Sequence, residues 1–166
     1  LSYNQMGEIC KTGPGNMLGY DNPEATAKAL QKHADGRVWL HTGDLGYMDE
    51  DGVLYVLNRG YSPRYGGGEL AILPMENLVA NARIDGIDDE FFVLLKDEAH
   101  PGYFVPYLYV VLEDGYTVDD IREKVEECLE PHMYPADIIQ IDERPFFHFK
   151  TNRIGLSKEL KEASAS

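Results

Sequence analysis

The chain has 166 residues, of which 43% are hydrophobic and 27% are charged, the balance of one globular domain or of two small joined units. Acidic residues outnumber basic ones by 29 to 15, and the formal charge of -14 repels phosphate backbones, so we expect no nucleic acid partner. No stretch approaches the roughly 18 apolar residues of a membrane span, and no basic stretch leads into an apolar one, so we expect neither a transmembrane segment nor a signal peptide.

The first 60 residues are predicted to form short strands and one helix. Because the chain begins with Leu1 rather than Met, we expect it to be a piece of a longer protein. Asn22 and Pro23 suit the cap and the first turn of a helix that extends to about Lys32. The run at 49–52 ends in Asp-Gly and favours a hairpin turn. Strands are expected at residues 7–12, 38–40, 45–48 and 53–57.

The remainder alternates strands with helices, which predicts a compact α+β unit. Residues 60–68 are rich in Gly, Tyr and Pro and are expected to form a hinge or loop. Pro74 is expected to open a helix, and Thr117 with Asp120 resembles a capping box at the start of another. Strands are expected at 91–95, 105–112 and 138–141, and a final helix at 157–163.

Cysteine and histidine usage predicts no metal site. Cys10 and Cys128 are far apart in sequence, unlike a metal or redox pair, and their number fits a reducing cytoplasm. The five histidines are scattered and show no metal-ligand spacing; they are His33, His41, His100, His132 and His148.

Two stretches carry a resemblance to a known family. One is Trp39-Leu40-His41-Thr42-Gly43-Asp44-Leu45-Gly46-Tyr47, continuing through the predicted hairpin to Asn58-Arg59, and the other joins Gly7-Glu8-Ile9 to Gly19-Tyr20 and Asn22-Pro23-Glu24-Ala25-Thr26. In this order they resemble the adenylate-forming superfamily, which includes acyl-CoA synthetases, peptide-synthetase adenylation domains and beetle luciferases. The resemblance covers residues 7–59 well and the remainder more loosely.

This resemblance implies an α+β fold in two parts. Residues 1–58 would be the closing segment of a large N-terminal adenylation domain, as a small β-rich subdomain. Residues 59–68 would be a hinge and glycine loop, and residues 69–166 a small mobile C-terminal domain with a short sheet flanked by helices. In this family the small domain swings between one pose for adenylation of a carboxylate by ATP and another for acyl transfer to a thiol such as CoA.

Asp44 and Arg59 match the family residues that approach the ribose of the nucleotide. A short carboxylate at a strand-to-turn junction can accept hydrogen bonds from both ribose hydroxyls, and such charge-assisted bonds are roughly twice as strong as neutral ones. The alternatives are that Asp44 caps its own turn and that Arg59 forms a surface ion pair.

The hinge departs from the family pattern. Tyr61 stands where an Asp or Lys is usual, and Pro63 is expected to break or shift the apolar strand that follows. Gly67 and Gly68 resemble the glycine loop near the pantetheine channel, where missing side chains let backbone approach a thiol carrier. A merely flexible turn is the equal alternative.

The catalytic lysine of the family is also displaced. Family members place Gly-Lys and an apolar residue before the terminal helix, where the lysine neutralises charge as the acyl-adenylate forms. Here the run from Lys150 to Leu156 puts Ile154 at that position without a gap and Arg153 with a small gap. Arg153 and Lys150 are therefore the candidate catalytic residues.

The implied function is that of a ligase fragment, inactive alone, whose cytoplasmic parent activates a carboxylic acid with ATP and Mg²⁺ and transfers it to CoA. The upstream N-terminal domain, which would hold the phosphate loop and the carboxylate pocket, is an expected partner. Two alternatives remain: an adenylation domain that loads a carrier protein, and a degenerate, non-catalytic module that binds nucleotide or a partner.

Overall fold

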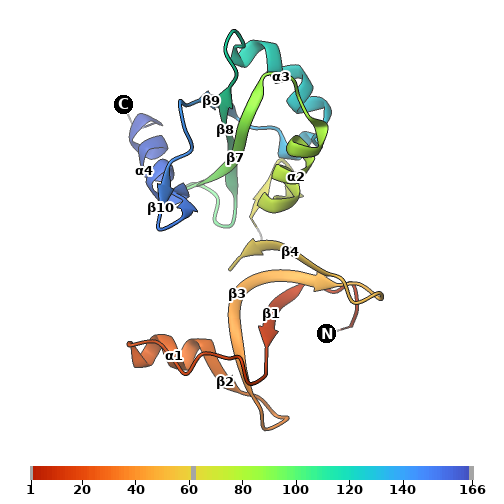
Figure 1. Ribbon diagram of the computed structural model, residues 1–166, viewed down its shortest axis with the longest axis vertical. Helices are drawn as coiled ribbons and strands as arrows, with labels where there is room; N and C mark the ends of the chain where they lie inside the picture. Colours follow the sequence, from red (N-terminus) through yellow and green to blue (C-terminus); the bar gives the residue numbers. More distant parts are fainter. Residues whose placement is uncertain (1, 61–62, 165–166) are drawn as a thin grey trace. The chain divides into compact units, whose positions relative to one another are not determined.

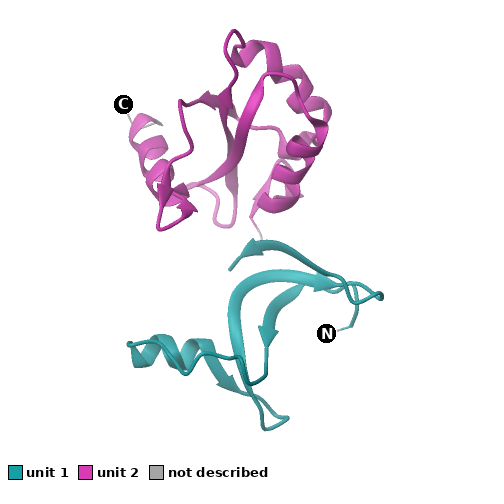
Figure 2. Cartoon of the chain, in the orientation of Figure 1, with its two compact units in different colours: residues 1–61 teal, residues 62–166 magenta. Residues whose placement is uncertain are grey.

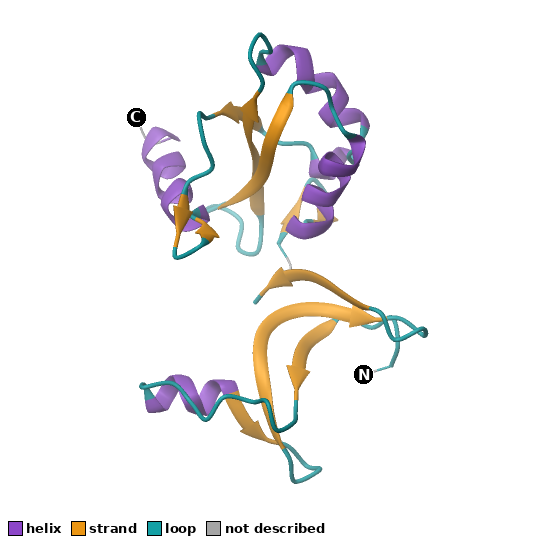
Figure 3. Cartoon of the chain, in the orientation of Figure 1, coloured by secondary structure: helices purple, strands orange, loops and turns teal. Residues whose placement is uncertain are grey.

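The computed structural model describes residues 2–60 and 63–164. The chain forms two compact units, residues 1–61 and residues 62–166 (Figure 2). Helices and strands occur in both units (Figure 3), which confirms the α+β class expected from the sequence. Over the described ranges, no helix has the length and apolar character needed to cross a membrane.

Unit 1 is built around one long strand, β3 (Val38–Met48). It pairs antiparallel with β2 (Leu30–Lys32), β1 (Gly7–Lys11) and β4 (Leu54–Arg59) (Figure 1). Gly46 lies where β1 and β4 both flank β3, and a Cβ there would stand 2.2 Å from the carbonyl oxygen of Tyr55. The close approach of the strands therefore requires glycine at this position.

The helix of unit 1 is shorter than the sequence suggests. Asn22 caps α1 (Pro23–Ala29) as expected, accepting the backbone N–H groups of Glu24 and Ala25 at 2.8 and 3.2 Å. The predicted end at Lys32 is wrong, because residues 30–32 form β2 and pair with the start of β3. The sequence suggested two separate strands, at residues 38–40 and 45–48, but both are parts of β3. Pairing with neighbouring strands along the whole length of β3 outweighs the local sequence preference.

The hairpin predicted around residues 49–52 is confirmed. Met48 pairs with Leu54, and at the turn the backbone N–H of Asp49 donates to the carbonyl oxygen of Val53 at 3.0 Å. Gly52 has φ +82°, the left-handed conformation for which glycine is suited. This hairpin joins β3 to β4 and so places the ends of the two strands side by side.

Unit 2 is a three-stranded sheet with helices on both faces (Figure 1). β7 (Ile87–Lys96) pairs antiparallel with β8 (Phe104–Leu112), and β8 pairs parallel with β9 (Asp137–Gln140). The main core lies between one face of the sheet and the helices α2 (Ile72–Ala82) and α3 (Val118–Glu127). On the other face, Leu156 of α4 (Arg153–Ser164) packs on Phe91, Val93 and Tyr109. Alternate residues of β7 thus serve the two faces.

Several ends in unit 2 differ from the predicted ones. The capping box of Thr117 and Asp120 is confirmed at the start of α3. α2 begins two residues before Pro74, which lies in its first turn, and α4 begins at Arg153 rather than Ser157. The earlier start of α4 follows from Asn152, whose side-chain oxygen accepts the N–H of Gly155 at 3.1 Å.

Two small hairpins and a short 3-10 helix complete unit 2. They are β5 (Arg64–Tyr65) with β6 (Gly68–Glu69), β10 (Phe146–Phe147) with β11 (Lys150–Thr151), and Pro131–Met133. Pro63 is buried and the strand after it has two residues, in keeping with the expected break. Tyr61, the departure noted at the hinge, lies outside the described residues, as does Ser62.

Candidate functional site

Asp44 and Arg59 lie opposite each other on adjacent strands. They are register partners of β3 and β4. Asp44 is partly buried and Arg59 is exposed. In the two described ranges, neither side chain makes a hydrogen bond or an ion pair, so neither of the two alternative roles expected from the sequence is formed. Within the described residues, the two charged groups therefore lie at the open end of the hairpin without a side-chain partner.

Backbone and side-chain contacts fix the turn that leads into Asp44. Gly43 has φ +75°, and its N–H donates to Glu8 Oε1 at 3.1 Å. The other carboxylate oxygen of Glu8 lies 2.7 Å from His41 Nδ1, and this bond holds the pKa of Glu8 below its ordinary value. The hydroxyl of Thr42 accepts the N–H of Asp44 at 3.0 Å and donates to the Ile9 carbonyl at 2.8 Å. β1 thus positions Asp44 from the neighbouring strand.

The predicted glycine loop is the turn of the β5–β6 hairpin. Gly67 has φ +89° and open space around the position of a Cβ. At Gly68, by contrast, a Cβ would stand 2.2 Å from the ring of His132. The Nε2 atom of that ring lies 3.2 Å from the carbonyl oxygen of Glu69. The close packing of His132 therefore explains why residue 68 is a glycine, whereas the backbone at Gly67 has open space beside it.

The two candidates for the catalytic cation differ in their surroundings. Lys150 is exposed at the start of β11, and among the described residues its ammonium group has no ion-pair or hydrogen-bond partner. Arg153 donates from Nε to the Phe92 carbonyl at 2.9 Å and from Nη2 to Glu76 Oε1 at 2.7 Å. The charge of Arg153 is already balanced inside unit 2, whereas that of Lys150 has no partner in the part of the chain that the structure describes.

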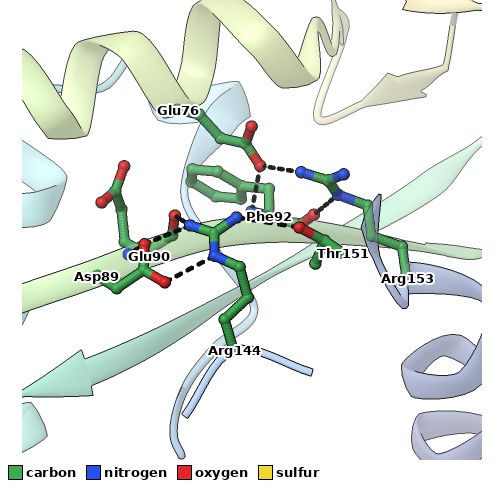
Figure 4. A network of polar contacts seen from close by, with 7 residues as sticks. All are labelled: Glu76, Asp89, Glu90, Phe92, Arg144, Thr151 and Arg153. Atoms are coloured by element: carbon green, nitrogen blue, oxygen red, sulfur yellow. Dashed lines mark hydrogen bonds and ion pairs between the residues drawn. The ribbon is translucent and has the colours of Figure 1, made fainter. Parts of the chain in front are cut away.

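A second arginine, Arg144, is held beside Arg153 in a network of polar contacts (Figure 4). Arg144 binds both carboxylate oxygens of Asp89, donates to the Glu90 carbonyl at 2.6 Å and donates to Thr151 Oγ1 at 3.1 Å. Its guanidinium also lies 4.6 Å from the centre of the Phe91 ring, an additional cation–π contact. The bond to Arg144 keeps the pKa of Asp89 below its ordinary value.

Comparison with known proteins identifies the family. No family model matches the chain. The 2-succinylbenzoate--CoA ligase of Geobacillus sp. (strain WCH70) is 36% identical over 149 residues, 84% of this chain and 27% of the relative. The 4-coumarate--CoA ligase 1 of Glycine max is 39% identical over 131 residues, 78% of this chain and 42% of the relative.

The solved structures agree. The o-succinylbenzoate CoA synthetase of Bacillus subtilis, in complex with its acyl-adenylate intermediate, is 28% identical with a TM-score of 0.75, over 94% of this chain and 31% of that one. The chain belongs to the adenylate-forming superfamily. This confirms the resemblance carried by residues 7–59, and the chain spans less than half of the length of the relatives that it matches.

In this adenylate-forming chain, several contacts join residues that sequence spacing could not connect. Glu8, Cys10 and His41 offer ligand atoms that all lie within 4.8 Å of one another, a possible metal-ligand set that the histidine spacing did not indicate. Cys10 and His41 are 31 residues apart and meet because their strands pair. Burial raises the pKa of the Cys10 thiol, which favours the protonated form over a thiolate ligand.

Glu90 makes the stability of this member of the superfamily sensitive to pH. Burial, reinforced by the nearby charges of Asp89 and Glu76, raises the pKa of Glu90 from 4.5 to about 7. Because the folded state holds this proton more tightly than the unfolded chain, folding loses stability as pH rises from about 4.5 to 7. The cost is fully present above pH 7 and absent below pH 4.5.

We therefore expect Glu90→Gln to stabilise unit 2 at pH 8 by about 1 kcal/mol, allowing for the partial exposure of the carboxyl, which corresponds to about 4 °C in the melting temperature. At pH 4 the same substitution should leave the melting temperature unchanged. Thermal unfolding followed by circular dichroism at both pH values measures this difference. Glu113→Gln, at an exposed position, is the control; an equal shift at both pH values would rule out the ionisation of Glu90 as the cause.

Proposed function

We propose that this chain is the C-terminal part of an acyl-CoA synthetase and comprises the last segment of its N-terminal domain and its mobile C-terminal domain. The whole enzyme would form an acyl-adenylate from ATP and a carboxylic acid and transfer the acyl group to CoA. The observation that carries the proposal is that Asp44 and Arg59 have no ion-pair partner among the described residues and lie at one end of a hairpin whose sequence is characteristic of the superfamily. The division into a closing segment (1–58), a hinge and glycine loop (59–68) and a mobile domain (69–166) is part of this proposal.

The ribose-binding role of Asp44 is implied by the resemblance to the superfamily, and the chemistry of a carboxylate suits that role. A carboxylate has two acceptor oxygens, and two neighbouring hydroxyls of a ribose present two donors at a matching spacing. Such charge-assisted hydrogen bonds fix the nucleotide without taking part in bond breaking. Arg59, on the adjacent strand, adds a cation that faces the anionic nucleotide and partly offsets the repulsion from the charge of -14.

The reacting phosphate needs positive charge as the carboxylate attacks it. We assign this role to Lys150, whose ammonium group is exposed and unpaired within the described ranges. Gly67, with its backbone open, is assigned to the passage of the pantetheine thiol of CoA. The upstream domain supplies the phosphate loop and the pocket for the carboxylic acid, and the products are the acyl-CoA, AMP and pyrophosphate.

Mg²⁺ enters as the partner of the ATP phosphates and is not assigned to residues of this chain. The one candidate metal-ligand set in the described residues contains a thiol and an imidazole, whereas Mg²⁺ prefers oxygen ligands in octahedral geometry. No step is therefore assigned to a metal held by this chain. The curated relatives cited above are named CoA ligases, which favours CoA over a carrier protein as the acyl acceptor. The two cysteines are free, in keeping with a reducing cytoplasm.

Activity measurements on two proteins test this proposal. The first is this chain alone, and the second is the parent enzyme, meaning the chain joined to its upstream domain. With ATP, Mg²⁺, CoA and a panel of carboxylic acids, we expect the parent to release pyrophosphate and form a thioester, and the chain alone to do neither. Turnover by the chain alone, or a parent that binds nucleotide and never releases pyrophosphate with any acid, would refute the proposal.

A further inference from the structure

The hairpin that presents Lys150 lacks the features that make a hairpin stable alone. Its strands, β10 and β11, have two residues each, and Phe146 and Phe147 are 65% and 63% exposed. Its turn residues are His148 and Phe149, with φ of 47° and 63°. Residues with a Cβ adopt this left-handed conformation at a cost in free energy, and even favourable two-stranded hairpins are marginal in water. The surroundings must therefore hold this hairpin in place.

Arg144 provides the first anchor. It lies two residues before β10, and its guanidinium contacts three different groups of unit 2: the Asp89 carboxylate, the Glu90 carbonyl and the hydroxyl of Thr151. Asp89 and Glu90 belong to β7, whereas Thr151 follows Lys150 in β11. A single side chain therefore links the segment before β10 and the strand β11 to the sheet of unit 2 (Figure 4). Its side chain is only 21% exposed, so water competes weakly for these contacts.

Arg153 provides the second anchor, on the other side of Lys150. Its bonds to the Phe92 carbonyl and to Glu76 pin the first residue of α4 to β7 and α2. The Glu76 oxygen also accepts the backbone N–H of Phe92 at 2.8 Å. Along the chain, Lys150 thus lies between two arginines that both bind the edge of β7, and these contacts restrain the backbone on each side of it.

We infer that Arg144 and Asp89 are positioning residues for Lys150: their ion pair fixes the hairpin so that the ammonium group is presented in one place. The inference rests on the proposed role of Lys150 in adenylate formation. Positioning contributes strongly to catalysis, and a misplacement of about 1 Å can cost on the order of 100-fold in rate. Because the proposed role of Lys150 is in adenylate formation, loosening the hairpin should slow that step and leave thiol transfer unchanged.

Asp89→Asn is the decisive variant, because it keeps the size of the side chain and removes the charge that Arg144 binds. In the parent enzyme, we expect the rate of acyl-adenylate formation to fall by about 10-fold or more, with transfer to CoA from a preformed acyl-adenylate unchanged. Asp88→Asn, at the exposed neighbouring position, is the matched control and should leave both steps unchanged. Equal losses in both steps, or no loss relative to Asp88→Asn, would overturn the inference.

A second readout does not depend on catalysis. In the 166-residue chain, hydrogen exchange of the backbone amides of residues 146–152 should accelerate at least 10-fold in Asp89→Asn and in Arg144→Gln. The double variant should exchange no faster than Arg144→Gln, because the contact between Asp89 and Arg144 is already lost in that variant. Exchange unchanged in both variants would refute the anchoring even if the parent proves to be a ligase. If the parent forms no acyl-adenylate but the exchange accelerates as expected, the proposed function fails and the anchoring stands.

Discussion

Replacement of Asp44 by Asn is expected to lower kcat/KM for acyl-adenylate formation by the parent enzyme by about 100-fold. The amide has nearly the same shape, but it lacks the negative charge and offers one acceptor oxygen instead of two. Two charge-assisted hydrogen bonds to ribose would then become at most one neutral bond, a loss of roughly 3 kcal/mol. Pyrophosphate release at varied ATP concentration measures the effect.

The control for Asp44 is another acidic residue of the same hairpin. Asp51 is exposed in the turn between β3 and β4, and Asp51→Asn should leave ATP use unchanged. Because the Asp44 side chain makes no hydrogen bond within the described residues, Asp44→Asn should also leave the melting temperature unaltered. Full activity in Asp44→Asn would disprove the ribose assignment, and a large fall in melting temperature would show a structural role instead.

Lys150→Ala and Arg153→Ala are expected to have different consequences. Loss of the exposed ammonium should slow acyl-adenylate formation by on the order of 100- to 1,000-fold, the usual effect of removing one group that stabilises developing charge, and leave stability unchanged. Loss of Arg153 should leave the Glu76 carboxylate, whose side chain is 16% exposed, with the Phe92 N–H but without its cation, and destabilise unit 2 by about 2 kcal/mol. Rapid-quench measurement of acyl-adenylate and thermal unfolding separate the two.

Lys158→Ala provides the matched control for these variants, because Lys158 is an exposed lysine of α4 outside the two hairpin strands. It should affect neither rate nor melting temperature. The opposite pattern, in which Arg153→Ala abolishes acyl-adenylate formation at a normal melting temperature and Lys150→Ala has no effect, would transfer the catalytic role to Arg153.

Short-range contacts could be predicted from the sequence, whereas structures that depend on contacts between distant residues could not. The cap at Asn22, the capping box at Thr117 and the turn at Gly52 were all visible, because each depends on residues within a few positions. The β10–β11 hairpin was not, because His148 and Phe149 occupy positions where Asn or Gly is usual. Its conformation depends on contacts that lie elsewhere in the fold.

The candidate site divides in the same way. Asp44 and Arg59 could be named from their motifs, and the hairpin prediction brought them close, but their roles stay predictions. The arginine network could not be named. Arg144 and Asp89 are 55 residues apart, and Arg153 and Glu76 are 77 apart, so no local pattern connects them. They meet because the sheet of unit 2 places β7 beside both the start of α4 and the segment before β10.

The arginine network also protects the protein from self-association. β7 is the outer strand of its sheet, and an outer strand exposes backbone groups that can recruit a strand from another molecule. Here the Glu90 carbonyl is bound by Arg144, and the N–H and carbonyl of Phe92 are bound by Glu76 and Arg153. Side chains thus occupy backbone groups of β7 that a second copy of the chain would need in order to extend the sheet. Aggregation through this part of the edge would first have to break three hydrogen bonds that involve charged groups.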